Sequence, residues 1–223
     1  MKFKALEKLS VIDYPGKLCA IVFTGGCNFR CSYCHNPELV VGYEKLPDID
    51  ESEILNFMER RRGFIDGISI TGGEPTIHKE LPEFISRVKE VGFLVKLDTN
   101  GTNPDMLLKI INNLDYVAMD IKTTPERYKE VTAVNVDLSS IEKSTEIIMN
   151  SSVDYEFRTT VFPEFFNKED AKQIGEWLKN AERYVLQRPR VIKTLSGNLK
   201  NAKLYNDSEL REFVPFLPNC TIR

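Results

Sequence analysis

Short apolar runs alternate along the chain with longer segments whose apolar residues recur every three or four positions. The short runs have the composition of buried strands, and they cover 19–24, 67–71, 93–98, 116–122, 155–161 and 184–187. The longer segments predict amphipathic helices over 50–62, 79–91, 103–114, 138–150, 168–180 and 207–214. Two of these have helix-start signals, because Asn103 precedes Pro104 and Asn167 lies three residues before Asp170.

This alternation predicts a parallel sheet joined by right-handed helical crossovers. A closed barrel of eight strand–helix units takes about 250 residues, or about 31 per unit. After a leader of 17 residues (1–17), a chain of 223 residues has room for six or seven units. We therefore expect a single α/β domain, 1–223, built as an incomplete barrel. Ligands of such sheets bind at the carboxyl ends of the strands, so the polar residues that follow each strand are the candidates for chemistry.

Composition excludes several classes of protein. The chain has 30 Lys+Arg against 33 Asp+Glu, a net charge of −3, and 42% of its residues are hydrophobic. These values are ordinary for a globular domain and argue against a general nucleic-acid binder, which needs concentrated positive charge. The apolar run 18–23 is too short to span a membrane, and the N-terminus has no apolar signal segment. We expect a cytoplasmic protein that binds neither membrane nor nucleic acid.

Three of the five cysteines fall within eight residues in the spacing C-x3-C-x2-C, at Cys27, Cys31 and Cys34. An odd number of cysteines cannot pair completely, so we interpret the three as metal ligands in a reducing compartment. Together, in a loop at 25–37, they can hold three corners of a cubane iron–sulfur cluster and leave the fourth iron open for chemistry. The alternative is a Cys3His zinc site that includes His35, although the chain has no second ligand pair.

The other two cysteines lie apart from this loop. Cys19 falls inside the first apolar run, where we expect a core side chain, and Cys220 is a bystander near the C-terminus. His78 is most simply a surface or capping residue.

The residues around the three cysteines resemble the signature of the radical S-adenosylmethionine (SAM) superfamily. The loop reads TGGCNFRCSYCHNPEL over 24–39, with the aromatic Tyr33 before the third cysteine, and it is preceded by KLSVIDYPGK over 8–17. Together these stretches are similar to the activating proteins of anaerobic ribonucleoside-triphosphate reductase, which are relatives of the pyruvate formate-lyase activating enzymes. The resemblance covers most of the chain and weakens after Leu186, so it does not assign a role to the segment that follows.

This resemblance implies a partial (βα)6 barrel, a [4Fe–4S] cluster on Cys27, Cys31 and Cys34, and SAM bound to the open iron. The reduced cluster cleaves SAM to methionine and a 5′-deoxyadenosyl radical, and in activating enzymes this radical removes hydrogen from a backbone glycine of a partner protein. The chain is therefore expected to be an oxidoreductase that acts on a glycyl-radical enzyme. Anaerobic ribonucleoside-triphosphate reductase is the expected partner, and the electron donor is not identified by the sequence.

The resemblance also assigns SAM contacts to strand ends. The turn TGGEP at 71–75 matches a superfamily motif, so Gly72 and Gly73 are expected to bind the SAM amino group. Glu74 is expected either to accept from that ammonium or to fix the turn. The other expected cofactor contacts are Tyr33, Asn36, Asp98, Thr99, Asp120, Lys122 and Arg158.

Charge suggests which part of SAM each of four of these residues contacts. Lys122 is expected at the SAM carboxylate, with Asp98 and Asp120 near the ribose or sulfonium, because SAM itself carries both signs of charge. The alternative is a local ion-pair network that only supports the fold. Arg158 is expected at the carboxylate or ribose, or in an ion pair with Glu156.

Two other functions compete with the activase. One is a radical SAM enzyme similar to carboxy-deazaguanine synthase that acts on a small molecule or RNA, and the other is a non-catalytic metal-binding module. We favour the activase because few residues remain for a lid, which leaves the barrel mouth open to a loop of another protein. The segment 162–166 follows the fifth predicted strand and contains three phenylalanines. We expect Phe165 or Phe166 to contact the partner, the alternative being that they pack on the following helix.

Overall fold

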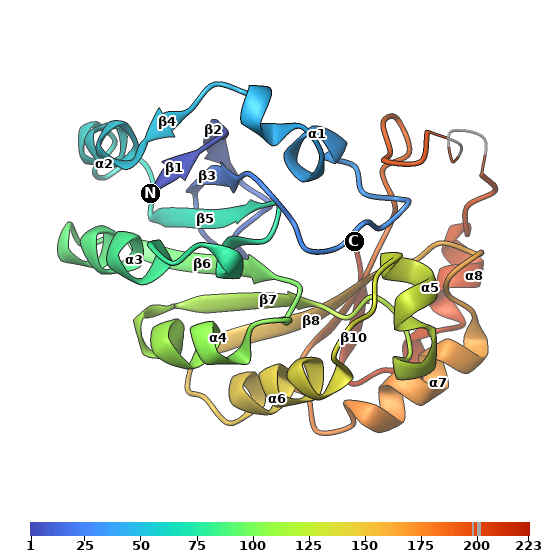
Figure 1. Cartoon of the computed structure of the whole chain (residues 1–223). Coiled ribbons are helices and arrows are strands. Elements are labelled where there is room, and N and C mark those ends of the chain that lie inside the picture. Colours follow the sequence, from blue (N-terminus) through green and yellow to red (C-terminus); the bar gives the residue numbers. More distant parts are fainter. Residues whose placement is uncertain (198, 200–201) are drawn as a thin grey trace.

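The computed structural model describes residues 1–197, 199 and 202–223 and contains a curved eight-stranded sheet with helices along its outer face (Figure 1). The strand order is β10-β9-β8-β7-β6-β5-β3-β2. Six consecutive neighbours are parallel: β3 (Cys19–Thr24), β5 (Gly67–Gly72), β6 (Leu94–Thr99), β7 (Tyr116–Asp120), β8 (Asp154–Thr160) and β9 (Tyr184–Gln187). The prediction of a mostly parallel α/β sheet with six strand–helix units is confirmed.

Each predicted helix is present: α2 (Glu51–Arg60), α3 (Leu81–Glu90), α4 (Pro104–Ile110), α6 (Leu138–Met149), α7 (Lys168–Trp177) and α8 (Asp207–Arg211). Both helix-start signals operate as expected. The Asn103 side chain accepts from the Met106 amide, and Asn167 and Asp170 form a capping box at the start of α7. These caps position the loops that precede the helices, and those loops form the carboxyl edge of the sheet.

The six-residue strand Ala5–Ser10 escaped the sequence analysis because its apolar and polar residues do not alternate. It is one of several missed elements, and the others are too brief to show periodicity. The missed elements are β1 (Lys2–Phe3), β2 (Ala5–Ser10), β4 (Ile49–Asp50), β10 (Cys220–Ile222), α1 (Pro37–Val40), α5 (Tyr128–Thr132), and 3₁₀ turns at Tyr43–Lys45, Pro75–Ile77, Ile111–Asn113, Pro125–Arg127 and Val214–Phe216. β2 pairs antiparallel with β3, so most of the predicted leader belongs to the sheet or to the loop beside it. β10 extends the other edge, parallel to β9.

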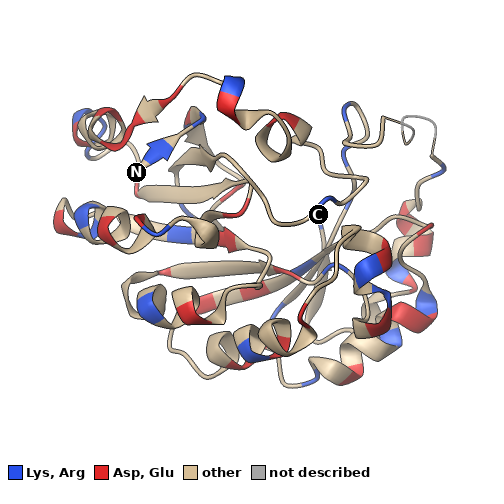
Figure 2. Cartoon of the chain, in the orientation of Figure 1, with Lys and Arg blue, Asp and Glu red and all other residues tan. Residues whose placement is uncertain are grey.

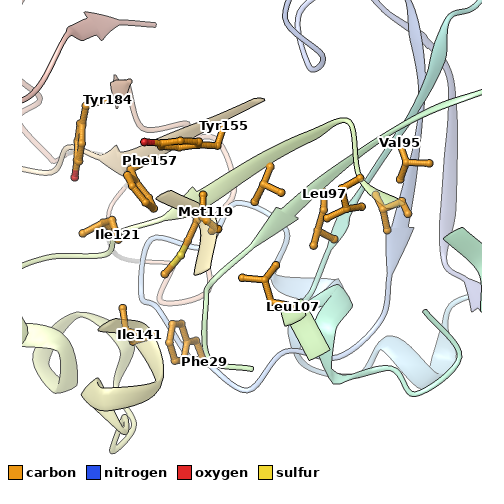
Figure 3. Packing of buried hydrophobic residues seen from close by; sticks show 14 of the residues in the cluster. Phe29, Val95, Leu97, Leu107, Met119, Ile121, Ile141, Tyr155, Phe157 and Tyr184 are labelled. Carbon is orange, nitrogen blue, oxygen red and sulfur yellow. The ribbon is translucent and has the colours of Figure 1, made fainter. Parts of the chain in front are cut away.

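The two faces of the parallel sheet carry different side chains. On the outer face, Val95, Leu97, Met119 and Phe157 pack towards the helices, as Figure 3 shows. Because successive strand residues point to opposite faces, the intervening positions put charged side chains on the concave face. Four of these, from β6, β7 and β8, are Lys96, Asp98, Asp120 and Arg158.

The amino end of the concave face is closed by the leader. The Tyr14 ring packs with its centroid 5.8 Å from that of Tyr116, in a small buried cluster with Cys19, Ile21 and Ala118. Cys19 is fully buried there, as expected of a core residue. Within the described part of the chain, no helix is both long and apolar enough to cross a membrane.

Candidate active site

The three clustered cysteines lie in the loop that follows β3. All three are free thiols, Cys31 is buried, and Cys27 and Cys34 are half-buried. Backbone amides face two of the sulfur atoms: the Phe29 N–H lies 3.4 Å from Cys27 Sγ, and the Asn36 N–H donates to the Cys34 thiol. Amide donors around sulfur are a regular feature of iron–sulfur sites.

The chemistry of this donor set fits a cluster. Burial raises the pKa of Cys27 to about 12 and that of Cys31 to about 11, and it also raises the pKa of Cys34. Metal ligands must be thiolates, so a cationic iron group has to supply the charge that makes these buried thiols ionise. The nearby Lys122 ammonium acts in the same direction, since it lowers the pKa of all three.

A single metal ion fits less well. Over residues 1–197, 199 and 202–223, no three His, Cys, Asp or Glu side chains are grouped so that they could hold one ion. Among these residues, Cys27, Cys31, Cys34 and His35 are thus not arranged as a Cys3His zinc site would be. A cubane cluster binds each thiolate at a different iron, so it does not require the thiols to converge on one point.

The turn after β5 is pressed against the start of the cysteine loop. The Gly73 amide donates to Thr24 O (2.9 Å), and the Glu74 amide donates to Gly26 O (2.8 Å). A Cβ on Gly73 would lie 1.8 Å from Gly26 O, and Gly72 has a φ of +116° with Thr24 backbone atoms 2.4 Å from its ideal Cβ position. Only glycine fits at either position, so the two glycines allow this turn and the cysteine loop to approach backbone to backbone.

Glu74 is 1% exposed and uses both oxygens inside the protein. Its Oε1 accepts from the Thr76 amide (3.1 Å), the Thr76 hydroxyl (2.6 Å) and the Thr99 hydroxyl (2.7 Å), and its Oε2 accepts from the Asn100 amide (2.7 Å). Burial raises its pKa even though these hydrogen bonds favour the carboxylate. Of the two roles expected for Glu74, this arrangement supports fixing the turn, and it joins the Thr99 side chain to the same task.

Two further contacts connect the cysteine loop to the neighbouring strand ends. His78, expected as a surface or capping residue, is the C-cap of the 3₁₀ turn Pro75–Ile77, and its Nε2 also lies 2.9 Å from Gly25 O. Asn100 donates to Asn28 Oδ1 (2.8 Å), and Asn28 in turn donates to the Thr102 hydroxyl (2.8 Å). Neither contact has a signal in the sequence pattern, because each depends on how three loops meet in space.

A network of alternating charges lies beside this loop, at the ends of β6, β7 and β8. Arg158 contacts Asp120 through Nη2 (2.9 Å to Oδ1) and Asp98 through Nη1 (3.4 Å to Oδ2). Lys122 Nζ lies 2.9 Å from Asp120 Oδ2, and Lys96 pairs with Asp98. β7 ends at Asp120, so Lys122 lies just past the strand rather than on it, yet the two side chains meet.

The network remains ionised at neutral pH. Burial opposes the charge on Asp98 and Asp120, but Arg158 and the adjacent lysines outweigh it and hold both carboxyl pKa values below their usual range. Burial likewise opposes the charge on Lys122, and Asp120 outweighs it, so the pKa of Lys122 is raised. The site therefore presents fixed charges of both signs next to the three thiols.

The sequence analysis missed Lys96, which is 1% exposed and lies two residues before Asp98 on the same face of β6. A lysine inside an otherwise apolar run, in phase with a strand-end carboxylate, was the available signal. The alternative partner of Arg158 is excluded, because Glu156 instead binds Arg223 (2.7 and 2.6 Å) and the Tyr116 hydroxyl (2.9 Å).

The aromatic segment 162–166, which follows β8, packs against the cysteine loop. The Tyr33 ring stacks on Phe162, with centroids 5.4 Å apart, and contacts Phe165 at 5.9 Å. Phe165 is 8% exposed and Phe166 is 1% exposed, with its ring against Phe213. The expectation that Phe165 or Phe166 contacts a partner is therefore wrong. The segment buries its rings under the loop and against the C-terminal part of the chain, which removes more apolar surface from water than a rim position would.

Known proteins resemble the chain along most of its length. The Radical SAM superfamily profile matches residues 21–178. A protein of Methanocaldococcus jannaschii named as a glycyl-radical enzyme activating enzyme is 36% identical, over 96% of this chain and 92% of its own length. The pyruvate formate-lyase-activating enzyme of Clostridium pasteurianum is 27% identical, over 95% of this chain and 90% of its own length. Among solved structures, Streptococcus suis SuiB bound to S-adenosylmethionine has a TM-score of 0.66 at 13% identity, covering 91% of this chain and 51% of SuiB.

Proposed function

The chain belongs to the radical SAM superfamily, and we propose that it is an activase that generates a glycyl radical on a partner protein, with anaerobic ribonucleoside-triphosphate reductase as that partner. As a member of this superfamily it uses a [4Fe–4S] cluster and SAM, which when bound supply reductive cleavage of SAM to methionine and a 5′-deoxyadenosyl radical. The protein itself binds the cluster and SAM and orients them for this reaction.

Cys27, Cys31 and Cys34 would hold the cluster, and the amides that face their sulfur atoms would stabilise its negative charge. Tyr33 and Asn36 lie within this loop. Tyr33 is fixed by the two rings beneath it, so its backbone is held rigidly beside the cluster. Asn36 gives its amide to the Cys34 thiol, which makes a supporting role more direct than a contact with SAM.

The polar strand ends would orient SAM by charge. Lys122 is a half-buried cation close to the thiols, so it would receive the SAM carboxylate. Asp98 and Asp120 are half-buried anions and would face the ammonium, sulfonium or ribose hydroxyls, while Arg158 holds the two carboxylates at a fixed separation. The Gly72-Gly73 turn lies directly against the start of the cysteine loop, so its backbone would meet the SAM amino group beside the cluster.

The observation that carries the activase function is similarity along nearly the whole chain to a glycyl-radical enzyme activating enzyme, 36% over 96% of this chain. The choice of anaerobic ribonucleotide reductase depends on the segment 8–17, whose sequence resembles the corresponding activating proteins. In the fold this segment is ordered: the Ser10 hydroxyl donates to Asp13 (2.5 Å), and Tyr14 is buried against the barrel.

The test is to incubate the anaerobically purified protein with SAM, a reductant and an anaerobic ribonucleoside-triphosphate reductase, and to record the EPR spectrum of the reductase. A glycyl-radical signal that disappears when the acceptor glycine of the reductase is replaced by alanine supports the proposal. Pyruvate formate-lyase serves as the parallel partner. A signal on that enzyme alone assigns a different partner, and SAM cleavage with no radical on either protein refutes the activase function.

A further inference from the structure

The segment that follows β9 lies along the cysteine loop, and we propose that it is the docking surface for an acidic one-electron carrier protein that reduces the cluster. We call residues 188–197 the strap. The inference rests on the proposed function, because reductive cleavage of SAM requires one electron to reach the cluster for each turnover. The carrier would be oxidised by one electron as the cluster is reduced by one.

Backbone hydrogen bonds attach the strap to the cysteine loop. The Leu195 amide donates to Cys34 O (3.1 Å), and the Ser196 amide donates to Ser32 O (3.0 Å). Cys34 is one of the expected cluster ligands, so the strap backbone is connected to that ligand through the Leu195 hydrogen bond. Because electron transfer slows steeply with distance, this is a favourable position for a donor.

The strap is basic, in a chain whose net charge is −3. Residues 188–197 contain Arg188, Arg190 and Lys193 and no Asp or Glu. Figure 2 shows Lys and Arg, without Asp or Glu, along the loop that follows β9. Arg188 pairs with Asp207 (2.9 Å) and Lys193 pairs with Glu38 (2.8 Å), but for exposed Arg190 no acidic partner is found among the described residues. An excess of positive charge therefore faces solvent beside the cysteine loop.

Arg190 is exposed and belongs to the same strap whose Leu195 and Ser196 amides bind the cysteine loop. An acidic carrier that approached the strap would therefore meet this uncompensated charge. Electrostatic attraction of this kind accelerates association and weakens as salt is added.

An exposed apolar side chain lies at the centre of the strap. Ile192 is 89% exposed, more than any other large hydrophobic residue in the described part of the chain, and it lies between Arg190 and Lys193 in sequence. An apolar centre with a charged rim is the composition of protein interfaces, and small contacts of this type suit transient redox complexes. The partner glycine loop has a different requirement, since it must enter the barrel mouth and reach SAM. The strap therefore fits the donor better than the radical acceptor.

The experiment compares two reductants on the cluster-loaded protein. Cluster reduction is followed by stopped-flow absorbance, with dithionite as a small reductant and a reduced flavodoxin of net negative charge as the protein donor. The variants are Arg190→Glu and Ile192→Asp, and the control is Lys109→Glu, which makes the same kind of charge change at an exposed site on α4. We expect flavodoxin to reduce the two strap variants at least about tenfold more slowly at low salt, with the difference shrinking at high salt. Dithionite reduction and the control should be unchanged.

Three outcomes overturn the inference. One is a flavodoxin rate in both strap variants equal to that of the wild type. Another is equal slowing with dithionite, which would mean that the strap only supports the cysteine loop. The last is normal reduction by flavodoxin with loss of the dithionite-driven glycyl radical, which would assign the strap to the radical acceptor. A failure of the proposed function is distinguishable, because it removes the glycyl radical from the wild type with every reductant and leaves the measured reduction rates unaffected.

Discussion

The close contact between the Gly72-Gly73 turn and the cysteine loop predicts a large effect for the smallest possible substitution, Gly73→Ala. The new Cβ would lie 1.8 Å from Gly26 O, whereas real Cβ contacts stay beyond 3.0 Å, so the two backbones must separate by at least about 1.2 Å. That movement stretches the hydrogen bond from the Glu74 amide to Gly26 O, now 2.8 Å long, out of range.

The magnitude follows from these two losses. Overpacking costs about 1–3 kcal/mol, and one lost hydrogen bond costs about 0.5–1.5 kcal/mol, so the free energy of unfolding should fall by about 1.5–4.5 kcal/mol. Cys27 directly follows Gly26, so the first expected cluster ligand moves with the loop. A misplacement of about 1 Å near the reacting groups can reduce a rate about a hundredfold. We therefore expect SAM cleavage to fall by about that factor in molecules that keep their cluster.

The assay pairs denaturant unfolding with iron content and with the rate of 5′-deoxyadenosine formation. Gly16→Ala is the control, because Gly16 has a φ of +71° with no atom within 4 Å of an added Cβ, and it therefore isolates backbone strain of about 1–2 kcal/mol without a clash. If Gly73→Ala bound a full cluster and cleaved SAM as fast as Gly16→Ala, the argument from close approach would be refuted.

Three other substitutions test separate parts of the site. Cys31→Ala should abolish the iron–sulfur absorbance, and Cys19→Ala should leave it intact, because only the former belongs to the cysteine loop; equal iron content in the two would contradict this. Lys122→Met should weaken SAM binding by about ten- to a hundredfold, the worth of a charge-assisted hydrogen bond, and unchanged affinity by calorimetry would limit Lys122 to a structural role. Asp120→Asn should destabilise the cluster-free protein near neutral pH. The partners of Asp120 lower its pKa in the folded protein below the ordinary 3.8. The ionised carboxylate therefore contributes its full stabilisation to the folded state above pH 3.8, and this stabilisation is lost as the pH falls through the folded pKa. The difference in melting temperature between wild type and variant should therefore narrow below about pH 4, and a difference that is constant down to pH 2 would exclude the ion pairs as its source.

Much of the fold could be predicted because its six central strand–helix units are long enough to show a period. The strand 93–98 is an example: its apolar residues Val95 and Leu97 alternate with Lys96 and Asp98, and this alternation puts two charges on the concave face. The edges could not be predicted in the same way. β10 has three residues, Cys220–Ile222, and it is held by pairing with β9 and by Arg223, whose side chain binds buried Glu156. Such contacts are between residues far apart in sequence, so they leave no local pattern.

In the candidate site, too, the local features could be predicted and the contacts between distant segments could not. The cysteine spacing and the strand-end carboxylates are local, and they were found. The aromatic segment 162–166 was placed correctly next to the mouth but given the wrong orientation, because its sequence does not indicate that Tyr33 and Phe213 are available to cover its rings. Three phenylalanines at a rim would expose a large apolar surface to water. The hydrophobic effect favours burying these rings wherever a neighbouring surface can cover them.

The position of Lys96 has a consequence for how the site tolerates its charges. Asp98 and Asp120 are half-buried near each other, and the negative charge of Asp120 disfavours the charge of Asp98. Arg158 alone would have to neutralise both, but Lys96 and Lys122 each pair with one carboxylate, so the row runs Lys, Asp, Arg, Asp, Lys with one excess positive charge. Buried ions are tolerated only when they are paired in this way. Lys122 is the cation of this row that lies next to the thiols, where the carboxylate of SAM would add the missing anion. The two readings weighed from the sequence, a structural ion pair and a ligand site, are therefore compatible, since the same network keeps its carboxylates ionised and leaves one cation for the ligand.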